Sequence, residues 1–243
     1  MYKRQVLDEA PGLAENLRVS GRPIGTYFGY HVLGFYADQK DIDSSPLNKI
    51  TAYPSIPGDF KYQDVNEDGI INNQDVVAIG HPNIPEYNAS LNMQFGYKGF
   101  QLSALFNAVT NVSSNVVFQS GGLNQYYAPM LERWTPGNTN ASWPVIRPGL
   151  NANPNESLND FTLQDASYIK LRNVQLSYSL PKKWITRLRL NSLTVFASGQ
   201  NLKTWTNFYG IDPENSLSGN AYASSVATIP TTKVFNFGLN LSL

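Results

Sequence analysis

The chain has 243 residues, and its 18 acidic and 18 basic side chains cancel to a formal net charge of zero. This balance argues against a nucleic-acid partner, which would require a basic excess. The sequence has no cysteine, which excludes disulfide bonds within it, and no apolar run long enough for a transmembrane helix. Abundant aromatic and neutral polar residues favour short alternating β-strands over helices.

The first candidate strand, residues 26–36, alternates only weakly and is followed by a long connection over residues 37–86. Strict alternation of apolar and polar residues begins in Tyr87–Tyr97. Alternation resumes in residues 100–108, with Leu105 as an exception, after a tight turn at Lys98 and Gly99. These segments predict a hairpin of two strands, each of about ten residues.

Residues 167–180 also predict a strand, but their alternation changes phase. The second half has a regular apolar face that starts at Val174, and Lys170 and Arg172 fall in register with it. A charge that faces the lipid midplane of a barrel costs about 2–4 kcal/mol. Either a β-bulge near Asn173 resets the phase, or the first half lies outside the apolar band, and we favour the second explanation.

Two further strands are predicted, residues 187–202 and residues 234–243, and the last alternates to the chain end without a charge or a proline. In a soluble protein such an apolar edge strand would be an aggregation hazard. In a closed barrel there is no free edge, and the apolar face meets lipid. Period-2 alternation also suits a soluble β-sandwich, which remains the alternative fold.

Connection lengths favour the barrel. The turns at residues 98–99 and 181–183 are short, whereas the connections at 37–86, 110–166 and 204–230 are long. This asymmetry is typical of outer-membrane barrels, in which the short turns are periplasmic and the long loops extracellular. Aromatic residues at the strand ends fit interfacial girdles: Tyr87, Tyr97, Phe100, Tyr178, Trp184 and Trp205.

We therefore predict an all-β fold, in which about six or more antiparallel transmembrane strands form part of a larger barrel with long extracellular loops. The smallest usual single-chain barrel has about eight strands. Polar residues in phase with one another would line the lumen: Asn92, Gln94, Asn173, Gln175, Asn236 and Asn240.

Several sequence blocks, in order along residues 20–243, resemble one family. They include GRPIGTYFGYHVLGFYADQKDI, PGDFKYQDVNEDGIINNQD, ERWTPGNTNASWP, DASYIKLRNVQLSYSLPKKW and IPTTKVFNFGLNLSL. Together they are similar to the C-terminal portion of SusC/RagA-type TonB-linked outer-membrane proteins. Members of that family often end in an aromatic residue, and this chain departs from the pattern by ending in Leu243.

The resemblance implies a location in the outer membrane and a part in TonB-dependent import of glycans or peptides, without enzymatic activity or a required cofactor. It implies a plug and a barrel of about 22 strands. The implied partners are a SusD-like lipoprotein, TonB (through an N-terminal part outside this chain), an oligosaccharide or peptide substrate, and outer-membrane lipid. Residues 6–243 would belong to the barrel. Residues 1–5, MYKRQ, look like a translated sequencing adapter.

The stretch DVNEDGIINNQD matches a calcium loop, with oxygen donors at alternate positions and Gly69 sixth. The candidate metal ligands are Asp64, Asn66, Asp68, Ile70, Asn72 and Asp75. The simpler alternative is an Asx-rich turn, in which these side chains accept hydrogen bonds from backbone amides. A calcium loop would also suit the rival function, a secreted β-sandwich carbohydrate-binding module with one structural calcium ion.

No catalytic motif is present: the sequence lacks G-x-S-x-G, a phosphate-binding loop and H-E-x-x-H. We interpret the carboxylates near loops as solvated charges: Glu132, Asp160, Asp165, Asp212 and Glu214. Aromatic residues near the loops could stack on sugar rings, but loop packing is the favoured interpretation: Tyr126, Tyr127, Trp134, Trp143, Trp205, Phe208 and Tyr209.

Overall fold

The computed structural model describes residues 21–116, 119–120, 125–126, 128–147, 157–186, 190–209, 212–214 and 231–242. The proposed adapter residues 1–5, Tyr127 and Leu243 lie outside these ranges. Within the described part, no helix has the length and apolar character needed to cross a membrane. The chain divides into two compact units: unit 1 comprises Met1–Ile84, Ser113–Asp165 and Gly219–Ala227, and unit 2 comprises Pro85–Val112, Ala166–Ser218 and Thr228–Leu243.

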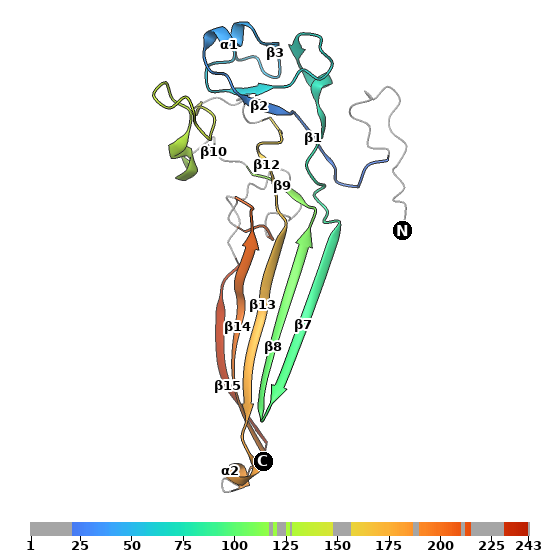
Figure 1. Cartoon of the computed structure of the whole chain (residues 1–243), viewed down its shortest axis with the longest axis vertical. Helices are drawn as coiled ribbons and strands as arrows, with labels where there is room; N and C mark the ends of the chain where they lie inside the picture. Colours follow the sequence, from blue (N-terminus) through green and yellow to red (C-terminus); the bar gives the residue numbers. More distant parts are fainter. Residues whose placement is uncertain are drawn as a thin grey trace. The chain divides into compact units, whose positions relative to one another are not determined.

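Unit 2 contains one antiparallel sheet of five long strands in the order β15-β14-β13-β8-β7 (Figure 1). The strands are β7 (Tyr87–Tyr97), β8 (Phe100–Thr110), β13 (Tyr168–Ser179), β14 (Ser192–Thr206) and β15 (Val234–Ser242). A short helix, α2 (Lys182–Ile185), lies between β13 and β14 in the chain. The five long strands predicted from the sequence are therefore confirmed, although β14 ends at Thr206 and not at residue 202.

The β7–β8 hairpin reverses in two residues because both take positive φ, 44° at Lys98 and 89° at Gly99. This is the backbone of a type I′ turn, whose twist matches that of the strands it joins. A Cβ at position 99 would also lie 2.9 Å from the carbonyl oxygen of Ser179, so glycine fits here for two reasons. The turn fixes the register in which Tyr97 faces Phe100.

The phase change in β13 is a β-bulge. Leu171 and Asn173 face consecutive residues of β8, so Arg172 is the extra residue in this strand. The pairing with β14 shifts at the same place. The bulge puts Leu171 on the apolar face with Val174 and turns Lys170 to the polar face. We favour, from the sequence, the explanation that the first half of this strand lies outside the apolar band. That explanation is wrong, because the β-bulge resets the phase.

Unit 1 is built from short pieces (Figure 1). Its strand pairs are β1 (Tyr27–Gly29) with β6 (Val77–Ile79), β2 (Val32–Phe35) with β4 (Phe60–Tyr62), β3 (Leu47–Asn48) with β5 (Ile70–Ile71), β9 (Ser113–Asn115) with β12 (Leu163–Asp165), and β10 (Gln119–Ser120) with β11 (Gln125–Tyr126). Its short helices are α1 (Gln39–Asp43), η2 (Asn73–Asp75) and η3 (Ala128–Glu132).

The weak strand expected over residues 26–36 does not join the five-stranded sheet. It is split into β1 and β2, which pair with β6 and β4. The split is consistent with its weak alternation, since both faces of this segment carry aromatic residues that pack within unit 1. The sheet thus has five strands from the described residues, not six.

Aromatic side chains hold unit 1 together. Phe60 and Phe161 lie 5.0 Å apart between ring centroids, and Trp143 meets Phe161 edge-on at 5.3 Å. Gly58 lies against the Trp134 ring so closely that an added Cβ would come within 2.6 Å of it. Such a contact leaves no room for a side chain in a packed interior.

This packing predicts that Gly58→Ala destabilises unit 1 more than Gly69→Ala does. Both glycines have positive φ, 89° and 80°, but a Cβ at Gly69 would meet nothing within 4 Å. We expect a loss of about 1 kcal/mol for Gly69→Ala from backbone strain, and about 1–3 kcal/mol more for Gly58→Ala from overpacking. Hydrogen exchange at the Tyr36 and Gly58 amides would measure both changes, and equal losses would contradict the packing argument.

Candidate functional site: a two-faced sheet with a buried ionic cluster

One face of the unit 2 sheet is apolar and open. The register aligns successive rows across all five strands, such as Phe95, Leu102, Leu176, Ala197 and Phe237. Large side chains on this face are exposed, and the exposed fraction of Phe237 is 81%. A monomeric soluble protein rarely exposes a continuous apolar surface of this extent. The face is suited to contact with lipid.

The dimensions of the face agree with that use. β7 has 11 residues, and ten rises of about 3.4 Å give about 34 Å. A tilt of about 35–45° reduces this to about 24–28 Å, close to the apolar band of about 25 Å in outer-membrane barrels. Aromatic residues mark both ends: Tyr97, Phe100 and Tyr178 share one row, and Tyr87 and Trp205 lie near the other end.

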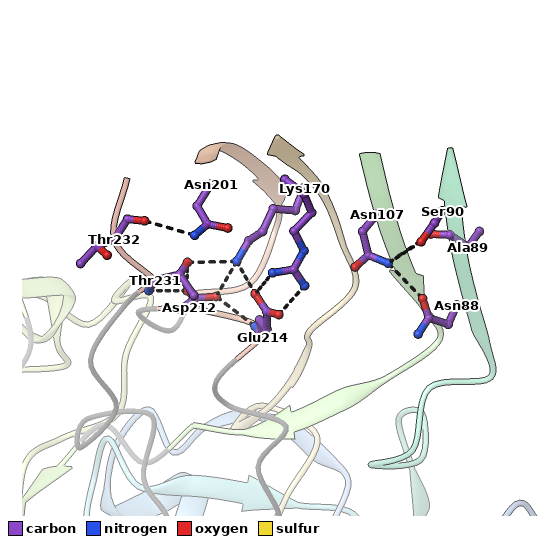
Figure 2. Close-up of polar contacts among 11 residues, drawn as sticks. Asn88, Ala89, Ser90, Asn107, Lys170, Asn201, Asp212, Glu214, Thr231 and Thr232 are labelled. Carbon is purple, nitrogen blue, oxygen red and sulfur yellow. Dashed lines mark hydrogen bonds and ion pairs between the residues drawn. The ribbon is translucent and has the colours of Figure 1, made fainter. Parts of the chain in front are cut away.

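The opposite face is polar. One row consists of neutral amides and hydroxyls on all five strands: Gln94, Ser103, Gln175, Ser198 and Asn236. The residues that the sequence assigned to the lumen share this face: Asn92, Gln94, Asn173, Gln175, Asn236 and Asn240. Nearer the end of the sheet at Tyr87, Asn107 donates hydrogen bonds from Nδ2 to Asn88 Oδ1 (3.1 Å) and Ser90 Oγ (3.3 Å) (Figure 2).

The five strands carry three charged residues, Lys170, Arg172 and Lys203. Lys203 is exposed on the apolar face opposite Leu171. It lies near the end of β14, where its long side chain can extend toward the interface. Lys170 and Arg172 have the opposite arrangement, because the polar face holds both of them in contact with Glu214.

Lys170 is fully buried at the centre of this group (Figure 2). Its Nζ lies 2.5 Å from Glu214 Oε2, 3.0 Å from Thr231 Oγ1 and 3.7 Å from Asp212 Oδ1. Arg172 donates to both carboxylate oxygens of Glu214, at 3.1 Å from Nη1 and through a shorter contact from Nη2. We call these five residues, Lys170, Arg172, Asp212, Glu214 and Thr231, the ionic cluster.

Asp212 organises the loop side of the ionic cluster. It accepts hydrogen bonds from the backbone amide of Thr231 (3.0 Å), the Thr231 hydroxyl (2.7 Å) and the backbone amide of Glu214 (3.0 Å). Burial alone would raise the pKa of Asp212, but the hydrogen bonds from Thr231 and Glu214 and the charge of Lys170 outweigh it and lower the pKa. Burial likewise opposes ionisation of Glu214, and its bonds to Arg172 and Lys170 lower its pKa. Both groups are therefore ionised at neutral pH.

The predicted calcium ligands lie together in unit 1, but their oxygens accept hydrogen bonds from the loop itself. Asp64 accepts from the Gly69 amide and Asp68 from the Ile70 amide, each at 2.8 Å. Buried Asp75 accepts from the amides of Val65 and Asn72, also at 2.8 Å. This arrangement fits the Asx-turn alternative. Over the described residues, no group of three or more His, Cys, Asp or Glu side chains could hold a metal ion.

The structure describes the surroundings of five of the aromatic residues considered for sugar binding. Trp134, Trp143 and Phe208 are buried, so loop packing accounts for them. Trp205 is on the apolar face and Tyr209 is exposed. Of the loop carboxylates, Asp160 pairs with His31, while Asp212 and Glu214 belong to the ionic cluster.

Sequence reasoning did not anticipate the ionic cluster. Lys170 and Glu214 are 44 positions apart in the chain, and Lys170 and Thr231 are 61 apart. The available signal was the phase conflict itself, since two cations in a transmembrane strand need partners on its polar side.

Comparison with known proteins agrees with this geometry. No family model matches the chain. TonB-dependent receptor P26 of Formosa agariphila is 29% identical over 248 residues, which cover 98% of this chain and 24% of the relative. TonB-dependent receptor P3 of the same organism is 28% identical over 250 residues, covering 97% and 24%. The chain thus spans about a quarter of the length of these relatives.

Solved structures of the RagAB peptide importer have the same fold. The open-open state matches with a TM-score of 0.66 and 19% identity over 92% of this chain and 23% of that chain. The closed-closed state matches with a TM-score of 0.63 and 19% identity over 90% and 23%. The five-stranded sheet is accordingly a section of a transmembrane barrel. Over nearly its whole length, the chain is therefore similar to about a quarter of a TonB-dependent receptor, and its fold is that of part of the RagAB importer.

Proposed function

We propose that the chain forms part of the barrel wall of an outer-membrane importer, and that the imported solute is a neutral oligosaccharide. The observation that carries this proposal is the polar face of the sheet. Its central row, from Gln94 to Asn236, offers amides and hydroxyls and no charge. Such groups exchange hydrogen bonds readily with sugar hydroxyls. Many weak contacts of this kind let a solute bind and also dissociate quickly enough to be transported.

The state of the charged residues supports a neutral solute over a charged peptide. Within the described strands, the cations on the polar face, Lys170 and Arg172, are paired with Asp212 and Glu214. A peptide has charged termini and side chains, and it would lose hydration beside the polar face of the described strands, whose two charges are already paired. The RagAB structures are described as those of a peptide importer, which concerns that protein. We assign glycans to this one.

We further propose that the complete receptor works with a SusD-like lipoprotein as a lid and with TonB through a part outside this chain. The similarity to RagAB supports a two-component importer. The rival function, a secreted β-sandwich carbohydrate-binding module, would need a second sheet to cover the apolar face. The exposure of Phe95, Phe237 and Leu239 on that face speaks for lipid instead.

A wall in lipid predicts opposite responses from neighbouring residues on the two faces. Leu176→Arg places a charge on the apolar face, and we expect it to destabilise the barrel by about 2–4 kcal/mol. Gln175→Arg, one residue away on the polar face, is the matched control and should cost less than about 1 kcal/mol. Denaturant unfolding of the full-length receptor in lipid vesicles would measure both, and equal costs would contradict the assignment of faces.

The solute class is tested in the source bacterium. Deletion of the full receptor gene should abolish uptake of a neutral oligosaccharide from a panel that also contains peptides of matched mass. Gln175→Glu should slow that uptake on the order of tenfold, because an unpaired carboxylate in the neutral row binds water that the sugar must displace. Gln175→Asn is the control and should remain near wild type. Loss of peptide uptake alone would overturn the assignment.

We also propose that the Asp64–Asp75 loop binds Ca²⁺ in the complete receptor, as its spacing suggests. Binding would require Asp64 and Asp68 to exchange their backbone hydrogen bonds for the ion. Calorimetry with Ca²⁺ on the full-length receptor should give a heat of binding that Asp68→Ala removes. If both proteins give no heat, the loop is stabilised by its own hydrogen bonds alone.

A further inference from the structure

The connection between β14 and β15 is attached to the wall at both of its ends. Near its start, Asp212 and Glu214 contact Lys170, which is on the neighbouring strand β13 (Figure 2). Near its end, Thr231 bonds to both Lys170 and Asp212. One buried ammonium group therefore contacts residues from both ends of this connection.

The bulge in β13 makes this attachment possible. Without an extra residue, strict alternation would put Lys170 on the same face as Val174, which faces lipid. With Arg172 inserted, Lys170 and Arg172 both reach Glu214 on the polar side. The neighbouring strand β14 is also irregular here, since Asn201 has φ 52°. Its side-chain Nδ2 donates to the carbonyl of Thr232 at 3.2 Å (Figure 2).

The energetics favour a closed arrangement. Lys170 has no exposed surface, so its charge depends on its partners rather than on water. Two cations face two carboxylates, and Arg172 engages Glu214 with two nitrogens, the strongest geometry for such a pair. Removing one member of a buried ion pair is strongly destabilising because it leaves an uncompensated charge. The cluster therefore behaves as one unit.

We propose that the ionic cluster is a latch that fixes both ends of the β14–β15 connection to the lumen-facing side of β13. The described ends of the connection, residues 212–214 and Thr231, then lie on the side of the wall that borders the passage. The latch also covers two cations that would otherwise attract anions into a neutral lumen. Asp212 and Glu214 are thus positioning residues. From the proposed function this inference takes only that the polar face borders the passage.

The latch should stay closed over the whole neutral range. Because the pKa values of Asp212 and Glu214 are lowered on folding, their stabilisation is complete above the ordinary carboxylate values of about 4. It is lost only as the pH falls further, through the lower folded values. The latch is therefore opened by competition or mutation rather than by mild acid.

Hydrogen exchange on the full-length receptor tests the proposal directly, because the amides of Glu214 and Thr231 donate to Asp212 within the latch. Glu214→Gln should speed exchange at the Thr231 amide on the order of tenfold or more. Lys170→Met should do the same, and the double variant should gain little further, since both changes open one unit. Glu132→Gln, which alters a carboxylate in unit 1, is the matched control and should have no effect.

Exchange in the β7–β8 hairpin should stay at the wild-type level in each variant, which separates opening of the latch from unfolding of the barrel. Unchanged exchange at Thr231 in Glu214→Gln, or additive effects in the double variant, would overturn the latch. Since the readout needs no solute, a receptor that takes up no oligosaccharide but shows the expected faster Thr231 exchange in Glu214→Gln would count against the proposed function and not against the latch.

Discussion

A backbone that crosses hydrocarbon must satisfy every amide and carbonyl group within the protein, because lipid offers no partners. A sheet satisfies these groups with the hydrogen bonds between its strands. The sequence can then vary only in which side chains occupy each face of the sheet. Successive side chains of a strand point to opposite faces, so an apolar face and a polar face require the alternation seen from Tyr87 to Tyr97 and again in β15. The two-residue turn at Lys98 and Gly99 preserves it, since Tyr97 and Phe100 face each other on the same side.

The same constraint makes the one interruption informative. An extra residue breaks ladder pairing on two sides of β13, and such breaks tend to be placed where function needs them. Here the interruption brings Lys170 and Arg172 to a single face, where they contact carboxylates of the β14–β15 connection. The local loss of regular pairing is thus coupled to the attachment of a loop. A barrel wall must keep apolar side chains toward lipid and must also hold loops on its inner side. The bulge allows one strand to do both.

The sequence was sufficient for features set by local patterns. The β7–β8 hairpin and β15 were predictable because alternation and turn chemistry are encoded by neighbouring residues. The bulge was only one of two explanations for Lys170 and Arg172, and the sequence alone did not favour it over a segment outside the membrane, because the partners of the two cations were unknown. Those partners are distant in the chain, and no periodicity links Lys170 to Thr231.

Residue type also left some roles open. Trp134 and Trp143 have the chemistry to stack on sugars, yet they pack in the interior of unit 1. Trp134 contacts Gly58, and Trp143 contacts Phe161. The oxygens of Asp64 and Asp68 suit a cation or a backbone amide equally, and hydrogen bonds to amides are what the loop itself can supply. Residues 26–36 showed too little alternation to define a long strand, and their short pairings depend on β4 and β6.

A barrel wall requires that one face of the sheet meets lipid and the other a water-filled lumen. Spin labels placed one at a time along β15 in the full-length receptor, reconstituted in bilayers, would test it most directly. Labels at Phe235, Phe237, Leu239 and Leu241 should be relaxed by oxygen dissolved in lipid, and labels at Asn236 and Asn240 by a water-soluble nickel complex. A period of two residues with opposite phases for the two relaxants is the predicted result. Uniform access of the water-soluble complex to both sets would show that the apolar face does not meet lipid, and would contradict the assignment of the two faces.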